Sequence, residues 1–140
     1  MKRKITKNFY WYEAASKCGR PTPLGRRKAI IATARSLERF RSKCGDRTIT
    51  IVSWYRTPQH NRKVKGRPKS KHLLGIAVDL RVKGMSHAKA RLIAMDMMRS
   101  GELPKGGIGF YPKRKAENGK GGKKGFLHLD FRGKNARWRG

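Results

Sequence analysis

Two short polar clusters hold the residue types in this sequence that are able to do chemistry. The first runs from Ser70 to Asp79 and includes His72, and the second contains His128 and Asp130. Two imidazoles and one carboxylate form a plausible catalytic zinc set, with a fourth position left open for water. A lone His or Asp in such a place is more often a structural hydrogen-bonding group. Because three occur with compatible spacing, we predict a metal site on His72, Asp79 and His128.

The chain must bend to bring the first two of these groups together. His72 and Asp79 are seven residues apart, a span of up to about 23 Å in an extended chain. Ligands of one zinc ion lie only about 2.0–2.2 Å from the metal. Gly75 lies between them and can adopt a backbone conformation closed to other residues. We therefore predict a bend at Gly75, a strand that presents Asp79, and a neighbouring strand that supplies His128.

Apolar periodicity predicts the helices that support this site. A helix is expected over Ala29–Cys44 and is ended by Gly45. Ser86 can cap a second helix that runs to about Arg99. A short helix is expected over Phe9–Cys18, after a basic, frayed start. The apolar stripe of the first helix is Ile30, Ala34, Leu37, Phe40 and Cys44, and the core side of the second is expected to hold Leu92, Ile93 and Met95.

Alternating patterns predict the strands. The expected strands are Thr48–Tyr55, Gly75–Val82, Gly107–Tyr111 and Phe126–Phe131. Asp79 falls on the opposite face from Val78 and Leu80, while His128 and Asp130 share one face. The segments 56–71 and 112–125 are expected to be loops, the latter basic and glycine-rich. The chain is therefore predicted to be one α+β domain over residues 1–140, with helices packed on an antiparallel sheet and the zinc site on the sheet face.

The charge of the chain points to an anionic partner. Thirty-seven Lys and Arg face eight Asp and Glu, a formal net charge of +29. Such an excess favours anionic wall polymers, nucleic acid or anionic membrane lipid as partners, without choosing among them. Cys18 and Cys44 match no zinc-finger or redox spacing and are expected to be ordinary thiols. The protein is expected to be a monomer.

The motifs resemble a known family of zinc peptidases. The run Ser70-x-His72-x-x-Gly75-x-Ala77-x-Asp79, followed by His128-x-Asp130, is similar to the zinc D-alanyl-D-alanine carboxypeptidases and murein endopeptidases. This family shares its fold with the hedgehog signalling domain. Residues 53–61 resemble the segment that carries a substrate-binding arginine, and residues 107–112 with 126–130 resemble the closing strands. Weaker likeness extends to residues 8–13 and 132–138.

The resemblance implies a hydrolase with one zinc per chain that cuts peptide bonds in bacterial peptidoglycan. Carboxypeptidase and endopeptidase members share the same ligands, so the bond cut stays open. Members include bacterial wall-remodelling enzymes and bacteriophage endolysins. No apolar signal-peptide core follows the basic residues at the start. We therefore expect the endolysin type, held in the cytoplasm before release and then acting on the cell wall.

Further roles follow for residues near the ligands. Arg56 is expected to act on the developing oxyanion or on a substrate carboxylate. Ser70 is expected to fix a ligand or a turn and to contact substrate, or else to be a plain loop serine. His60 either lines the cleft or is an ordinary surface histidine. Imidazole and carboxylate also accept iron or manganese, so zinc is favoured by the resemblance and the nitrogen-rich ligand set.

The general base is the least determined role. Gly125, Phe126 and Leu127, directly before the last ligand, cannot take a proton. Asp130 is the best candidate, because residues two apart on a strand share a face. In the alternative, Asp130 only orients His128 or pairs with an arginine. Two rival functions also stay open: a basic nucleic-acid-binding module, and an inactive relative that only binds the wall.

Overall fold

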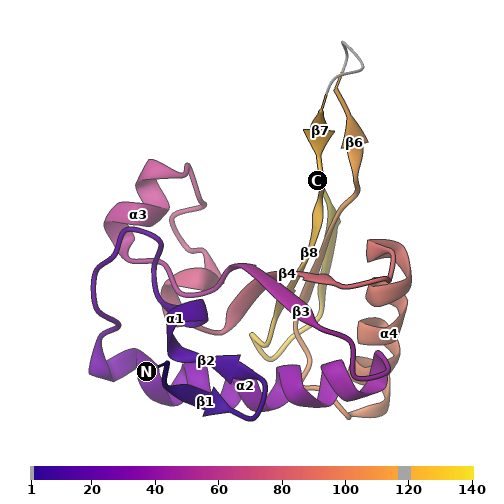
Figure 1. Ribbon diagram of the computed structural model, residues 1–140, viewed down its shortest axis with the longest axis horizontal. Coiled ribbons are helices and arrows are strands. Elements are labelled where there is room, and N and C mark those ends of the chain that lie inside the picture. The colour runs from indigo at the N-terminus through magenta and orange to yellow at the C-terminus, as the bar shows by residue number, and fades with distance from the viewer. Residues whose placement is uncertain (1, 117–120) are drawn as a thin grey trace.

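A mixed five-stranded sheet lies at the centre of the computed structural model, which describes residues 2–116 and 121–140 (Figure 1). Its strand order is β3-β4-β8-β5-β9, and only β5 and β9 run parallel. The strands are β3 (Ile49–Ser53), β4 (Ala77–Val82), β8 (Phe126–Asp130), β5 (Gly107–Tyr111) and β9 (Ala136–Arg139). The α+β fold is confirmed, but the sheet is not antiparallel throughout. Because β8 is antiparallel to β5, a tail that reverses after β8 and adds beyond β5 must run parallel to β5.

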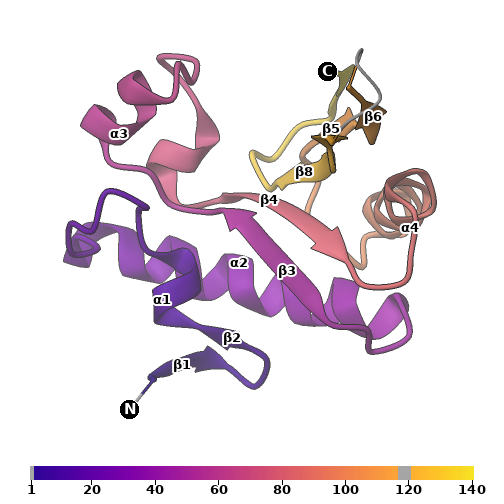
Figure 2. The same ribbon diagram turned by 45° about the horizontal axis from the view of Figure 1, so that its top comes forward.

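Helix α2 (Leu24–Lys43) carries the largest part of the helical core. Figure 2 shows it running beneath β3 and β4. The stripe Ile30, Ala34, Leu37, Phe40 and Cys44 is buried as predicted. Burying each large apolar side chain stabilises the fold by about 1.5–3 kcal/mol. The helix begins directly after Pro23, five residues before the predicted start. The prediction missed these residues because they are mostly exposed and show no apolar stripe.

Helix α4 (His87–Ser100) begins as predicted but faces the core with different residues. The Ser86 side chain accepts a hydrogen bond from the Lys89 amide and caps the helix. Leu92 is 56% exposed, so its assignment to the core was wrong, while Ile93 and Met95 are only partly buried. The buried stripe consists of Ala90, Ala94, Met97 and Met98. Small residues and methionines form this face. The prediction chose the more hydrophobic Leu92 as a core residue and so identified the wrong face.

The start of the chain and the segment 56–71, both expected to be irregular, form regular structure. The start of the chain makes a hairpin of β1 (Lys4–Thr6) and β2 (Phe9–Tyr10), and the helix expected over Phe9–Cys18 shrinks to α1 (Trp11–Ala14). Helix α3 (Pro58–Lys63) interrupts the loop expected over 56–71. Its start signal is Thr57, which accepts from the His60 amide, followed by proline at the first helical position.

The basic loop expected over 112–125 contains a two-stranded ribbon. Its strands are β6 (Arg114–Lys115) and β7 (Gly122–Lys123), and Figure 1 shows the ribbon projecting from the body. Residues 117–120 of that loop lie outside the described residues. Cys18 and Cys44 are free thiols. Within the described ranges, no helix combines the length and the apolar character needed to cross a bilayer.

Candidate metal centre

One row of residues across the sheet carries the centre of the site. Asp79 on β4 pairs with Ser53 on β3 and with His128 on β8. His128 pairs with Gly109 on β5, which pairs in turn with Trp138 on β9. Directly opposed residues point to the same face of a sheet. The row therefore lies on the face opposite the buried apolar core, as the alternation in the sequence predicted.

A single turn of 3₁₀-helix, η1 (Lys71–Leu74), brings His72 to this row. The Ser70 hydroxyl accepts from the His72 amide at 3.2 Å and caps the turn. Gly75 ends the turn in the left-handed conformation, with φ of +78°. A Cβ at this position would lie 2.9 Å from Cγ1 of Ile30. The bend predicted at Gly75 is confirmed, and it requires glycine for both its backbone angle and its packing.

We expect Gly75→Ala to weaken both the fold and the metal site. The left-handed conformation alone costs about 1–2 kcal/mol in a residue with a Cβ, and the contact with Ile30 adds to it. Gly101→Ala is the matched control, because Gly101 has φ of +84° but a Cβ added there would meet no atom within 4 Å. Urea unfolding should show the larger loss for Gly75→Ala. Equal losses of unfolding free energy in the two variants would show that packing against Ile30 does not contribute to the requirement for glycine at position 75.

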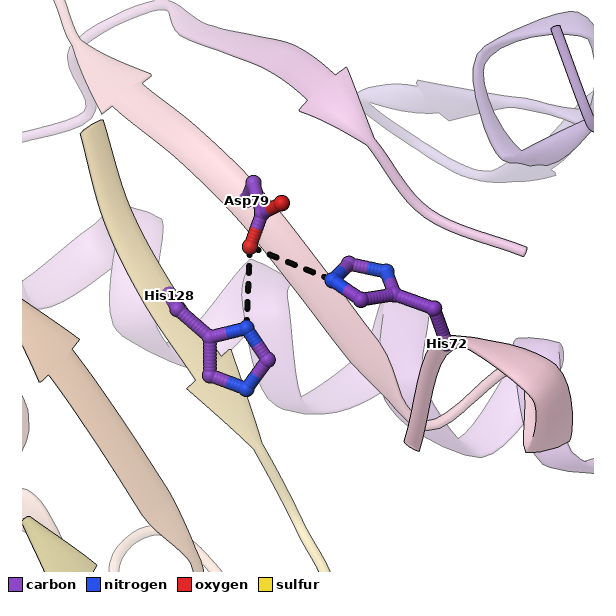
Figure 3. A group of neighbouring side chains, drawn as sticks. All are labelled: His72, Asp79 and His128. Atoms are coloured by element: carbon purple, nitrogen blue, oxygen red, sulfur yellow. Dashed lines mark hydrogen bonds and ion pairs between the residues drawn. The ribbon is translucent and has the colours of Figure 1, made fainter. Parts of the chain in front are cut away.

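The three predicted ligands meet on one carboxylate oxygen (Figure 3). Nε2 of His72 lies 3.2 Å from Oδ1 of Asp79, and Nδ1 of His128 lies 2.9 Å from the same oxygen. One donor atom from each residue falls within 4.8 Å of the others, and all three residues are buried. The structure therefore brings together His72, Asp79 and His128 as the sequence predicted.

Each histidine ring makes a hydrogen bond on the side away from Asp79. This bond fixes which ring nitrogen carries the proton and which one turns a lone pair toward Asp79. Nδ1 of His72 lies 2.6 Å from the carbonyl oxygen of Trp54, which can only accept, so Nδ1 carries the proton. Nε2 of His128 lies 2.8 Å from Oδ2 of Asp130 and donates to it in the same way. In their neutral forms both rings then direct a lone pair at Oδ1 of Asp79. Three converging lone pairs repel one another unless a cation, either a proton or a metal ion, lies between them. With a metal ion they form a donor set of two nitrogens and one oxygen.

Asp130 stabilises the orientation of His128 from beneath the site. Arg132 binds both oxygens of Asp130, with Nε 2.8 Å from Oδ1 and the terminal nitrogen 2.7 Å from Oδ2. The Gly107 amide donates to Oδ1 at 2.9 Å. Asp130 is fully buried and is not among the described residues that line the cleft. This position favours the alternative in which Asp130 orients His128, and its role as general base stays a prediction.

The charges of the site oppose the effect of burial. Burial raises the pKa of the Asp79 carboxyl, but its close contacts with the rings of His128 and His72 lower this pKa well below its ordinary value. Burial also raises the pKa of Asp130, and the bonds from Arg132 and His128 outweigh it, so this pKa too is lowered. Both carboxylates are therefore ionised at neutral pH.

The stability of the chelated protein should fall as the pH rises above about 6.5. Burial lowers the pKa of His128, but bonds to Asp130 and Asp79 outweigh it and raise this pKa above 6.5. A pKa raised on folding stabilises the fold below the unfolded value, and the contribution is lost as pH rises through the folded value. With zinc the trend should reverse, because protons compete with the metal for His128. Melting temperatures between pH 6 and 9, with zinc or with chelator, measure both slopes; parallel slopes would contradict the assignment.

A cleft of about 760 Å³ opens above the three residues. Arg56 and Ser70 line it, so both can reach a bound substrate, whereas His60 lies on α3 and is not among the described lining residues. Arg56 is held by Oδ2 of Asp79 at 3.4 Å and by the Ser53 hydroxyl at 3.2 Å. Its guanidinium is thus fixed beside the ligands and faces the cleft.

Three aromatic residues form a wall of the cleft that sequence reasoning missed. Tyr111 and Phe126 stack with centroids 4.4 Å apart, and the Trp138 indole donates to the Tyr111 hydroxyl at 2.9 Å. The Trp138 ring lies 4.9 Å from that of His128. A Cβ at Gly109 would lie 2.5 Å from the Trp138 ring, so glycine is needed beneath it. In the sequence, Gly109 within the expected strand was the signal that another group approaches the backbone closely there.

Comparison with known proteins agrees with the geometry. No curated protein matches the chain. The family model described as Peptidase M15 matches residues 8–130. That range includes the three converging residues, His72, Asp79 and His128, and ends at Asp130, the residue that orients the last of them. The site and the match over most of the chain lead to one conclusion: this protein belongs to the peptidase M15 family.

Proposed function

We propose that this protein is a zinc-dependent peptidase that hydrolyses peptide bonds in bacterial peptidoglycan. The observation that carries the proposal is the convergence of three lone pairs, from His72, Asp79 and His128, at the floor of a cleft. Two nitrogens and one oxygen suit zinc and leave a position for water and substrate. One zinc per chain is expected.

The chain's own residues position the reaction. A zinc ion bound here supplies a Lewis acid for the scissile carbonyl and the attacking water. Arg56 offers a fixed guanidinium, either to the oxyanion that develops or to a substrate carboxylate. Ser70 supports the site by holding the His72 amide. Asp130 and Arg132 hold the ring of His128 with one nitrogen free for the metal.

Support for peptidoglycan as the substrate comes from membership of the M15 family and from the motif resemblance. An endolysin-like role, with the protein held in the cytoplasm and then released onto the wall, is part of the same proposal. It is supported by the resemblance alone. The large positive charge is consistent with a substrate that carries anionic polymers.

The test is lysis of isolated peptidoglycan with and without chelator. Turbidity should fall with the zinc-loaded protein, stop on chelation and resume when zinc is restored, and elemental analysis should give about one zinc per chain. Muropeptides that stay intact despite bound zinc would indicate an inactive wall-binding relative. Salt-sensitive DNA retention without zinc would indicate the nucleic-acid-binding module instead.

A further inference from the structure

The ribbon of β6 and β7 carries positive charge away from the body of the protein (Figure 1). Its described residues, 113–116 and 121–124, include five cations and no acidic residue. All five are exposed, and none is among the described residues that line the cleft. Within the part of the chain that the structure describes, none of them has a carboxylate within ion-pair distance. The five cations are Lys113, Arg114, Lys115, Lys123 and Lys124.

The register of the ribbon places cations on both of its faces. Arg114 lies directly opposite Lys123, so two like charges share one face. Lys115, the next residue along β6, points to the other face, where its partner is Gly122. Like charges directly opposite each other destabilise a pair of strands. An anion that binds between them relieves this repulsion.

Side chains of the body hold the ribbon at its base. A two-stranded hairpin is at best marginally stable by itself. Arg81 on β4 donates to the Gly125 carbonyl at 2.7 Å, and a ring nitrogen of His87 on α4 lies 2.9 Å from the Lys124 carbonyl oxygen. The base of the ribbon is therefore fixed to the sheet and to a helix, while its cations extend outward.

Cations on both faces suit a groove that has an anionic wall on each side. A flat bilayer surface contacts only one face of a ribbon, and residues 113–116 and 121–124 include no large apolar side chain to enter the lipid. A single flexible polymer chain has no second wall. Duplex DNA has phosphate backbones on both sides of each groove, and its major groove, about 12 Å wide, admits a two-stranded β-ribbon.

We propose that the β6–β7 ribbon docks in a groove of duplex DNA and binds its phosphate backbones without sequence specificity. Lysine ammonium groups contact phosphate as point charges, and phosphate contacts carry no direct information about the base sequence. The formal net charge of +29 attracts the same partner at longer range. This is a function separate from peptide hydrolysis, because the ribbon cations lie outside the described lining of the cleft.

The experiment measures binding of a short fluorescent DNA duplex by anisotropy over a series of salt concentrations. The native chain is compared with a ribbon variant that carries Lys113→Gln, Lys115→Gln, Lys123→Gln and Lys124→Gln. Arg114 is kept, because its guanidinium donates to the Gly140 carbonyl at 2.7 Å. Each lost phosphate contact lowers the slope of log K against log salt by about 0.9, so the slope should fall by about 3–4. At physiological salt, Kd should rise by at least about tenfold.

A matched variant removes the same charge from exposed positions outside the ribbon. It carries Lys7→Gln, Lys17→Gln, Lys28→Gln and Lys83→Gln. Its salt slope should stay within about one of the native value, and circular dichroism checks that both variants are folded. Equal losses of DNA affinity in the two variants would show that total charge, rather than the ribbon, attracts DNA. That result would overturn the proposal.

Other ligands separate a groove from other anionic partners. A single strand of the same sequence has no groove, so the ribbon substitutions should weaken duplex binding more than strand binding; equal weakening would contradict docking in a groove. Vesicles of phosphatidylglycerol and isolated cell walls test the other surfaces. If the ribbon substitutions abolish binding to either of these and leave duplex binding unchanged, the ribbon binds lipid or wall polymer and the proposal is wrong.

The proposed peptidase function can fail without affecting this inference. No residue of the metal centre is changed in either variant, and DNA binding is measured without a peptide substrate. A chain that cleaves no peptidoglycan but loses duplex binding only in the ribbon variant would still support the docking. A chain that cleaves peptidoglycan and binds duplex equally well with and without the ribbon lysines would reject the docking alone.

Discussion

Asp79→Asn should remove zinc binding and peptidase activity together. Oδ1 of Asp79 lies within hydrogen-bond distance of both histidines, so the negative charge of this carboxylate lies at the centre of the site. An amide is neutral and a far weaker metal ligand than a carboxylate. Replacing the residues that only hold a ligand in place already costs about 10–100-fold in metal affinity, and the loss of a direct ligand should exceed that. We expect turnover to fall by on the order of a thousandfold.

The matched control is Asp96→Asn. Asp96 is an exposed carboxylate on α4 that pairs with Arg99, so this variant makes the same chemical change away from the cleft. It should keep one zinc per chain and full activity. Elemental analysis and peptide turnover measure both proteins, and circular dichroism checks that each is folded. Full zinc occupancy in folded Asp79→Asn would exclude Asp79 as a ligand.

The convergence of His72, Asp79 and His128 was predictable because it depends on local patterns. Alternation along a strand places Asp79 and His128 away from the apolar face, and one glycine allows the bend that returns His72. These features need only the sequence near each residue. The stripe of α2 was predictable for the same reason, since a helix shows its buried face in its own spacing.

The aromatic wall was not predictable, because it depends on pairing between distant strands. Trp138 reaches the site only because β9 joins β5 in parallel register, opposite Gly109. No local pattern near Trp138 contains that pairing. The segment around Lys65 was expected to be part of a loop over residues 56–71, but the turn that holds it depends on a buried Asn61 from α3.

The role of Asp130 shows where a local pattern reaches its limit. Alternation placed Asp130 on the same face as His128, and their hydrogen bond confirms this. The pattern could not show that Arg132 and the Gly107 amide would cover the carboxylate. A Cβ at Gly107 would lie 2.3 Å from Oδ2, so the neighbouring strand packs directly on it. Whether the Asp130 carboxylate can reach a water molecule in the cleft, as a general base must, depends on tertiary structure and cannot be read from the local sequence.

Asp130→Asn should weaken zinc binding by about 10–100-fold while turnover at saturating zinc changes little. The carboxylate accepts the proton on Nε2 of His128, which keeps the other ring nitrogen free for the metal. An asparagine that turns its NH₂ toward this ring favours the wrong tautomer, with the proton on Nδ1. It also weakens the pairing with Arg132, so some loss of stability is expected.

A general base would give the opposite result. Loss of a positioned base costs about 10²–10⁴-fold in turnover, and zinc affinity should then stay near that of the native protein. Arg132→Gln serves as the control, since it keeps the carboxylate on His128 and removes the guanidinium that pairs with that carboxylate. Zinc Kd from chelator competition and kcat at saturating zinc separate the two roles. Because Asp130 is sealed beneath the row that holds the ligands, we expect the change to appear in Kd rather than in kcat.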